Sequence, residues 1–332
     1  MINSKSILIL GANSFSGSVL IKFLLDSKFK VIGINRSQEV SSSYRAYSLS
    51  EEKDNLHLFE LGSNYQPQDV IEICKRNNVD SIFNFAAQSM VAQSWLTPWD
   101  WYETNCVWLS RLTSALINWG GLRRFIHFST PEVYGSTTGW IGEETPFNPS
   151  TPYAISRAAG DLHLLGEYRR SGFPVIFTRA ANVFGPYQQR YRIIPKALIA
   201  AATDQTLELH GGGSSERSFI FMEDVAQALV RILSDGVVGS CYHISTNRLV
   251  TIRKVVEMCF ESYGKNPHSY LLDSDDRPGK DKAYMLDSSK LRTNLGWSDA
   301  TSLEVGIEKT RHWVDYWLDS LVNEPSEYIH KA

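Results

Sequence analysis

Cysteine is scarce in this chain of 332 residues, and its four copies are scattered. Cys74, Cys106, Cys241 and Cys259 form no CxxC spacing, and no pair of histidines lies near any of them. Structural zinc sites and disulfide frameworks both depend on closer and more regular spacing of their ligands. The pattern therefore argues against both, and we expect all four thiols to be small apolar core residues. No metal site is predicted.

An excess of one charge and a long apolar run are also missing. Lys+Arg 33 against Asp+Glu 36 gives a net charge of −3 without a basic block, so nucleic acid is not an expected partner. The apolar run near the N-terminus stops at Gly11, which is too short for a signal peptide or a membrane span. We therefore expect a cytoplasmic protein with no membrane partner. The length exceeds one typical domain, as in a large α/β enzyme.

Residues 7–27 carry the first positive signal, because an apolar run, a glycine turn and apolar residues at helical spacing predict a strand, a turn and a helix. Gly11 and Gly17 would allow a tight turn that brings backbone N–H groups to a pyrophosphate. Ser14 replaces the usual middle glycine, and an ordinary turn would explain a match of two glycines nearly as well. The candidate dinucleotide contacts of this turn are Gly11, Asn13, Ser14, Phe15 and Gly17.

The end of a second predicted strand, within residues 29–37, is where such a fold reads the adenosine ribose. An acid there favours the free 2′-hydroxyl of NAD, whereas an arginine favours the 2′-phosphate of NADP. Asn35, Arg36 and Ser37 occupy the position and no acid does, which favours NADP over NAD. The alternative is that Arg36 is only a solvated charge. The Ser-rich segment 38–55 that follows predicts a surface loop.

Further strands and helices complete a doubly wound pattern. Strands are predicted over 56–62 and 79–89, separated by an amphipathic helix over 69–78. The candidate contacts at these strand ends are Glu60 and Leu61 beside the adenine, Ala86 and Ala87 against the cofactor, and Gln88 and Ser89 in the cleft. A long tryptophan-rich helix is predicted within 95–120, after Pro98, with an aromatic stripe that belongs to the core or in part to a subunit interface.

The regular alternation of strands and helices ends after residue 186. Helices are predicted beyond it over 188–203, 222–235, 251–264 and 302–322. No repeat or long linker separates the two parts. We predict a dinucleotide-binding domain made of 1–182 plus about 219–247. A substrate lobe made of about 183–218 plus 248–332 would be woven onto it.

Candidate chemistry gathers at STPEVYGS (129–136) and at the helix that begins near residue 152. A buried strand over 124–130 would deliver Thr130 and Glu132 into a cleft. Tyr153 and Arg157 are four residues apart and so share one helix face. A tyrosine one turn from a permanent cation and opposite a carboxylate is suited to redox and acid–base chemistry.

Seven segments in this order resemble the extended short-chain dehydrogenase/reductase superfamily, in particular the nucleotide-sugar 4,6-dehydratases that act on dTDP-glucose or GDP-mannose. They are GANSFSG (11–17), FNFAAQSMVAQS (83–94), STPEVYG (129–135), YAISR (153–157), RAANVFGPYQQ (179–189), HGGGSSERSFIFMEDVAQAL (210–229) and DDRPGKDKAYMLDSSKLRTNLGW (275–297). The resemblance implies an α/β fold with a Rossmann-type, doubly wound parallel sheet and a smaller, interwoven C-terminal substrate lobe.

The resemblance also implies catalytic roles. Tyr153 would remove the proton of the sugar C4 hydroxyl, Thr130 would hydrogen-bond the C4 oxygen, and Glu132 would remove the C5 proton. Arg157 stands where the family has lysine, so the activating charge on the tyrosine is kept while a lysine proton relay is not. Pro131 replaces the aspartate of dTDP-glucose dehydratases, but GDP-mannose dehydratases also lack that acid.

For the diphosphate and the nucleotide, the resemblance implies Asn182, Arg217 and Arg277, since guanidinium groups bind phosphate oxygens in a bidentate manner. The other candidate substrate contacts are Gln88, Ser89 and Thr130. Arg190 and Arg192, with Gln189, would add to this pocket or be solvated helix charges.

The activity implied is a nucleotide-sugar 4,6-dehydratase that keeps its NAD(P) tightly bound and acts as a homodimer through helices near 97–119 and 153–170. Alternatives within the superfamily are a 4-epimerase, a 4-oxidoreductase and a dehydratase that stops at or diverts the 5,6-ene. An alternative from another class is a non-catalytic protein that senses a dinucleotide or a nucleotide sugar.

Overall fold

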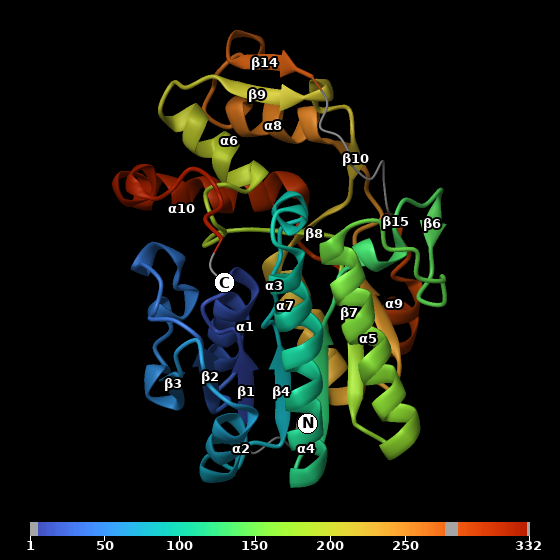
Figure 1. The fold of residues 1–332 in the computed structure, drawn as a ribbon. Coiled ribbons are helices and arrows are strands. Elements are labelled where there is room, and N and C mark those ends of the chain that lie inside the picture. The colour runs from blue at the N-terminus through green and yellow to red at the C-terminus, as the bar shows by residue number, and fades with distance from the viewer. Residues whose placement is uncertain (1–5, 276–284, 331–332) are drawn as a thin grey trace.

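The computed structural model describes residues 6–275 and 285–330. Its centre is a seven-stranded parallel sheet in the order β12-β7-β5-β4-β1-β2-β3, which confirms the predicted fold class (Figure 1). The strands are β1 (Ile7–Leu10), β2 (Val31–Asn35), β3 (Leu56–Glu60), β4 (Ser81–Asn84), β5 (Arg124–Phe128), β7 (Val175–Ala180) and β12 (Cys241–Ile244). Because the strand order reverses between β1 and β4, ligands in such a fold bind outside the carboxyl ends of these two strands.

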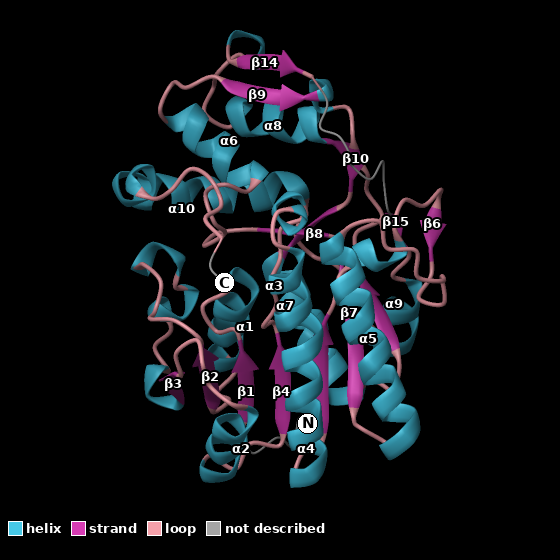
Figure 2. Ribbon diagram, in the orientation of Figure 1, coloured by secondary structure: helices cyan, strands magenta, loops and turns pink. Residues whose placement is uncertain are grey.

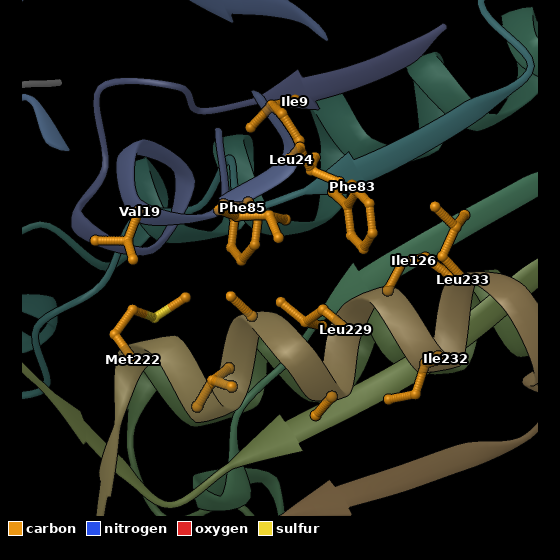
Figure 3. Packing of buried hydrophobic residues seen from close by; sticks show 14 of the residues in the cluster. Ile9, Val19, Leu24, Phe83, Phe85, Ile126, Met222, Leu229, Ile232 and Leu233 are labelled. Atoms are coloured by element: carbon orange, nitrogen blue, oxygen red, sulfur yellow. The ribbon is translucent and has the colours of Figure 1, made fainter. Parts of the chain in front are cut away.

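Helices cover both faces of this sheet (Figure 2), because successive residues of each buried strand point to opposite sides. Ile7 and Ile9 join a core that contains α1 (Phe15–Asp26) and α7 (Met222–Asp235), whereas Leu8 and Leu10 join a core on the other face. That second core contains α2 (Pro67–Arg76), α4 (Leu109–Trp119) and α5 (Pro152–Ser171). In Figure 3, Phe83 and Phe85 point from the sheet toward Leu229 of α7.

The long helix predicted after Pro98 in the tryptophan-rich segment is confirmed from Pro98 to Trp119, but its middle turn is π-helical. The segment consists of η4 (Ala92–Trp95), α3 (Pro98–Tyr102), the π-helical turn η5 (Glu103–Trp108) and α4. Its aromatic stripe is also divided, because Trp101 is fully buried whereas Trp95 and Trp99 are 62% and 64% exposed. The π turn holds the buried Asn105, which bonds to two other segments of the chain and so provides a physical reason for the irregularity.

Residues 38–55 are a second correction, since they are not a simple surface loop. They form three 3-10 turns, η1 (Ser42–Tyr44), η2 (Ala46–Leu49) and η3 (Lys53–Asn55). Ala46 and Tyr47 are buried against α1, and Ser18 accepts a 2.8 Å hydrogen bond from the Ala46 amide. The polar composition of the segment concealed these few apolar anchors.

A second group of elements, here called the upper lobe, has its own core above the carboxyl ends of the central strands (Figure 1). It comprises α6 (Ile193–Ala202), β9 (Leu207–His210), α8 (Ile252–Glu261), β14 (Leu271–Ser274) and α10 (Leu303–Asn323). Short pairs connect it to the rest: β8 (Asn182–Phe184) with β11 (Phe219–Phe221), and β10 (Glu216–Arg217) with β13 (Val250–Thr251). Another pair, β6 (Trp140–Ile141) with β15 (Met285–Leu286), leads to α9 (Ser289–Leu295). The two cores are the basis on which we propose the domain division given above.

Helix α6 begins at Ile193, five residues after the predicted start. Cys74 and Cys259 are buried, while Cys106 and Cys241 are only half-buried, so the expected core location holds for two of the four. Over the described ranges, no helix is both long enough and apolar enough to cross a membrane. A cytoplasmic location stays a prediction.

Candidate active site

A cleft of about 580 Å³ lies between the carboxyl ends of the central strands and the upper lobe. It brings together ten of the predicted site residues: Ser14, Phe15, Ala87, Ser89, Thr130, Glu132, Tyr153, Arg157, Asn182 and Arg217. Other predicted contacts do not line it: Gly11, Asn13, Gly17, Asn35, Arg36, Ser37, Glu60, Leu61, Ala86 and Gln88. Arg277 lies outside the described residues.

The turn between β1 and α1 requires both glycines. Gly11 has a φ of +84°, and a Cβ there would lie 3.0 Å from the Ala86 amide nitrogen. A Cβ on Gly17 would lie 2.3 Å from the Gly11 carbonyl oxygen. Ser14 caps α1, since its Oγ accepts from the Gly17 amide at 3.0 Å and donates to the Gly11 carbonyl at 2.7 Å. The serine that replaces the middle glycine thus stabilises the turn and leaves an acid-free helix N-terminus that fits a phosphate.

Asn13 joins this turn to the end of β2. Its amide donates to Asn35 Oδ1 at 2.6 Å, and its side chain donates to the carbonyls of Ser37 and Gln38 at 3.1 and 2.8 Å. The segment predicted to read the adenosine ribose is therefore fixed against the glycine turn.

Gln88 is held differently from the expected contact in the cleft. It is 6% exposed, and Asn105 in the π turn binds both its amide, at 2.8 Å, and its carbonyl, at 2.9 Å. Asn105 also donates to Ser156 Oγ at 2.9 Å, which joins this strand end to α5. Sequence reasoning missed Asn105, because Glu103 and Thr104 beside it are also polar and nothing local distinguishes it.

Thr130, Glu132 and Tyr153 meet at the floor of the cleft. Thr130 caps the 3-10 turn η6 (Pro131–Tyr134), where its Oγ1 accepts from the Glu132 amide at 3.3 Å. Burial raises the pKa of the Tyr153 phenol, and the Glu132 carboxylate raises it further. The Arg157 charge and a hydrogen bond with Thr130 act in the opposite direction and favour the phenolate.

Arg157 lies one turn along α5, a helix that Thr151 caps by accepting from the Ala154 amide at 3.2 Å. Its guanidinium is 4% exposed and donates from Nη2 to the carbonyl of Phe128. The buried Nε has no hydrogen-bond partner within the part of the chain that the structure describes. A buried donor without a partner at the cleft fits a ligand hydroxyl, such as those of a dinucleotide ribose.

A layer of buried charges that sequence reasoning missed lies directly beneath this floor. Asp161, one turn beyond Arg157, accepts from Ser129 Oγ and from Arg179 Nη2, both at 2.7 Å. Its other oxygen lies 3.4 Å from His127 Nε2. Burial alone would raise the pKa of Asp161, but Arg179 and His127 hold it well below its usual range. One carboxylate therefore ties β5, β7 and α5 together.

Arg190 and Arg192, expected as helix charges, both precede α6 and point to different places. Arg192 lines the cleft, and its charge lowers the pKa of Tyr153. Arg190 turns away and donates to the carbonyls of Val322, at 2.9 Å, and Glu324. Among the described residues, no group of three or more His, Cys, Asp or Glu side chains could hold a metal ion.

The comparisons with known proteins decide the family. A sequence model described as GDP-mannose 4,6 dehydratase matches residues 8–310. The chain belongs to the GDP-mannose 4,6-dehydratase family. This family member is 31% identical over 325 residues to a dTDP-glucose 4,6-dehydratase of Xanthomonas campestris, with 92% of each chain covered.

Two further comparisons bear on the length and on the fold of this chain. It is 33% identical over 325 residues to a trifunctional UDP-glucose 4,6-dehydratase, epimerase and reductase of Arabidopsis thaliana. That match covers 95% of the chain but 48% of the plant protein, so the chain spans about half the length of this relative. The crystal structure of a dTDP-glucose 4,6-dehydratase from Bacillus anthracis superimposes with a TM-score of 0.84 at 28% identity, covering 94% and 96% of the two chains.

Proposed function

We propose that this protein is a nucleotide-sugar 4,6-dehydratase that converts a nucleoside-diphosphate hexose into its 4-keto-6-deoxy form. The observation that carries the proposal is the convergence of Thr130, Glu132 and Tyr153 on one cleft, with Arg157 beneath them. Family membership and the dTDP-glucose dehydratase relatives support the same reaction.

Tyr153, as phenolate, takes the proton of the C4 hydroxyl, and Thr130 orients the C4 oxygen. The Arg157 charge favours the phenolate against the burial that raises the pKa of Tyr153, and Arg157 cannot itself give up a proton. When bound, NAD(P) supplies the hydride chemistry, accepting the C4 hydride and returning it to C6, so no net oxidant is consumed.

Glu132 removes the C5 proton, which is acidic once C4 is a ketone. The C6 hydroxyl must leave with a proton, and the neighbouring Pro131 has no titratable group. Glu132 therefore returns the proton that it took, acting first as base and then as acid. As C6 receives the hydride, C5 takes one proton from solvent and Tyr153 releases the C4 proton to solvent, so the product is lighter than the substrate by one water.

The cations in the cleft define the substrate class. Arg192, at the start of α6, and Arg217, in β10, line the same space as Arg157, and Glu132 is the one carboxylate among the described lining residues. An excess of guanidinium groups with the amide of Asn182 suits a diphosphate. We propose Asn182, Arg217 and Arg277 as substrate contacts. The assay described next identifies the sugar and the nucleotide base.

Incubation of the purified protein with a panel of nucleotide hexoses in D₂O tests the function. The expected product is lighter by one water, carries solvent deuterium at C5 and forms without net consumption of cofactor. An unchanged mass with inverted C4 would mean an epimerase, and net consumption of NAD(P)⁺ an oxidoreductase. An accumulating 5,6-ene would mean that the missing acid at Pro131 diverts the reaction. No turnover despite bound dinucleotide would favour a sensing protein.

The cofactor is NAD(P), as in the Bacillus anthracis structure, which is a complex with NAD. Arg36, directly after β2, still predicts NADP for this chain, because its cation would pair with a 2′-phosphate. Replacing Arg36 by alanine should then weaken NADP binding about tenfold or more in a titration and leave NAD binding unchanged. Equal effects on both dinucleotides would make NAD the cofactor.

A homodimer is proposed from an exposed apolar stripe. Ile155 and Leu162, two turns apart on one face of α5, are 42% and 56% exposed, and Trp99 on the neighbouring α3 is 64% exposed. Exposed large apolar side chains on adjacent helices are typical of an interface between subunits. Sedimentation should give a dimer at micromolar concentration, and Leu162→Glu should give a monomer. A monomeric wild-type protein would count against this interface.

A further inference from the structure

The last described residues, 324–330, follow α10 and return to the central sheet instead of projecting into solvent. In Figure 1 the red trace that follows α10 turns from that helix toward the central sheet. The family match stops at residue 310, so residues 324–330 lie outside the matched region, whereas their partners lie within it.

The first part of this segment is tied to the wall of the cleft. Arg190 binds the carbonyls of Val322 and Glu324. The ring of Tyr328 packs edge-on against Tyr191, with centroids 5.8 Å apart, and Tyr191 lines the cleft. Burial raises the pKa of the Tyr328 phenol, and the charge of Arg36, the residue that follows β2, acts in the opposite direction.

The end of the segment is tied to the strand on the other side. The imidazole of His330 stacks on Trp101 with centroids 4.7 Å apart and an interplanar angle of 13°. Its Nε2 lies 2.9 Å from Asp100 Oδ2. Trp101 donates to the carbonyl of Ser89 at 3.1 Å, and Ser89 follows β4 and lines the cleft.

The two attachments reach one cleft. Tyr328 packs on Tyr191, and His330 is anchored through Trp101 to Ser89, which follows β4. Tyr191 and Ser89 line the same cleft as Ser14, Phe15 and Ser16 at the start of α1. The segment therefore joins two parts of the wall of the cleft at the start of α1. A cavity of about 200 Å³ beneath it shares Gln189 and Tyr191 with the main cleft.

We propose that residues 324–330 form a strap across the dinucleotide site, in which Tyr328 and His330 are positioning residues that retain the cofactor. The inference rests on the NAD(P) cofactor proposed above. A dinucleotide in this cleft would lie against the wall that the strap joins, so it would leave only after the strap detaches. Slow release suits a reaction that returns its hydride within each turnover.

The test measures the rate at which prebound dinucleotide leaves the full-length protein. The protein is separated by rapid gel filtration at successive times, and the dinucleotide that stays bound is quantified by mass spectrometry. Tyr328→Ala and His330→Ala should each release it at least about tenfold faster, which corresponds to about 1.4 kcal/mol. His330→Phe, which keeps the stack on Trp101 but loses the bond to Asp100, should fall between them and the wild type. Tyr316→Ala is the matched control, because Tyr316 lies on α10 and is 79% exposed.

Equal release rates in the wild type, Tyr328→Ala and His330→Ala would overturn the strap. An equal acceleration in Tyr316→Ala would also overturn it, since the effect would then be a general one of the C-terminal region. If the wild type binds neither NAD nor NADP in a titration, the proposed function itself fails. Thermal unfolding of each variant without dinucleotide should match the wild type, which separates loss of the strap from loss of the fold.

Discussion

The two walls of the cleft are built on different principles. The lower wall consists of residues 128–132 and the first turns of α5. Its polar groups Ser129, Arg157 and Asp161 are buried, and hydrogen bonds join residues 128 and 129 to α5. On the upper wall, Arg192 and Arg217 are only half-buried. The groups that support the lower wall are thus held by buried hydrogen bonds, whereas the cations of the upper wall are partly open to solvent.

The largest expected effect lies in the lower wall and separates two roles. Tyr153→Phe should lower kcat by about 10²–10⁴-fold, because it removes the base for the first proton. Glu132→Gln should lower product formation as strongly but still allow C4 oxidation, visible as a rise in near-ultraviolet absorbance without deuterium at C5. Identical behaviour of the two variants in both readouts would contradict separate roles.

The second effect concerns stability and compares a buried pair with an exposed one. Asp161→Asn leaves Arg179 buried without its counter-charge and should cost about 3–5 kcal/mol of unfolding free energy. Glu304 pairs with Arg248 at 2.6 Å, with both side chains 52% exposed, so Glu304→Gln should cost less than about 1 kcal/mol. Denaturant unfolding measures the loss of unfolding free energy in both variants. Similar losses would show that the buried pair contributes no more to stability than the exposed pair.

A third effect is the loss of stability in acid that His243, next to the buried charges, should cause. The Tyr134 hydroxyl accepts from Arg179 Nη1 and lies 2.8 Å from His243 Nε2, and His243 Nδ1 lies 3.2 Å from the Asp287 carbonyl. The ring is thus bonded as neutral imidazole, and burial, with the Arg179 charge, lowers the pKa of His243 to about 3.

Because the unfolded chain binds this proton near pH 6.5 and the folded chain does not, stability should fall as pH decreases from 6.5 toward 3. The slope from one such group is at most about 1.4 kcal/mol per pH unit. His243→Gln should therefore show a shallower loss between about pH 6.5 and 4.5. A parallel pH profile would mean that His243 does not contribute to the acid sensitivity.

Local sequence signals made the glycine turn and the lower wall of the cleft predictable. The strand, glycine turn and helix of 7–27 follow from adjacent residues, and Tyr153 and Arg157 share a face because of their spacing alone. These are short-range properties, and the structure places Thr130, Glu132 and Tyr153 around one cleft as the local patterns indicated.

Long-range contacts could not be read in the same way. Asp161 meets Arg179 only because α5 packs on β7, and Asn105 reaches Gln88 only through a π turn. Arg190 and Arg192, two residues apart, differ because one meets the chain's C-terminal segment and the other faces the cleft. No local pattern distinguishes such partners.

The smallest effect compares backbone strain in the scaffold with strain at the cleft. Lys28, after α1, and Met90, in the cleft wall, have φ values of 64° and 78°, which favour glycine. Lys28→Gly should stabilise the fold by about 1 kcal/mol without changing KM, because this lysine is exposed. Met90→Gly also relieves strain but removes a side chain that lines the cleft, so its gain should be smaller and its KM higher. Unfolding and steady-state kinetics of both variants measure the difference; an unchanged KM in Met90→Gly would mean that strain at the cleft serves the scaffold alone.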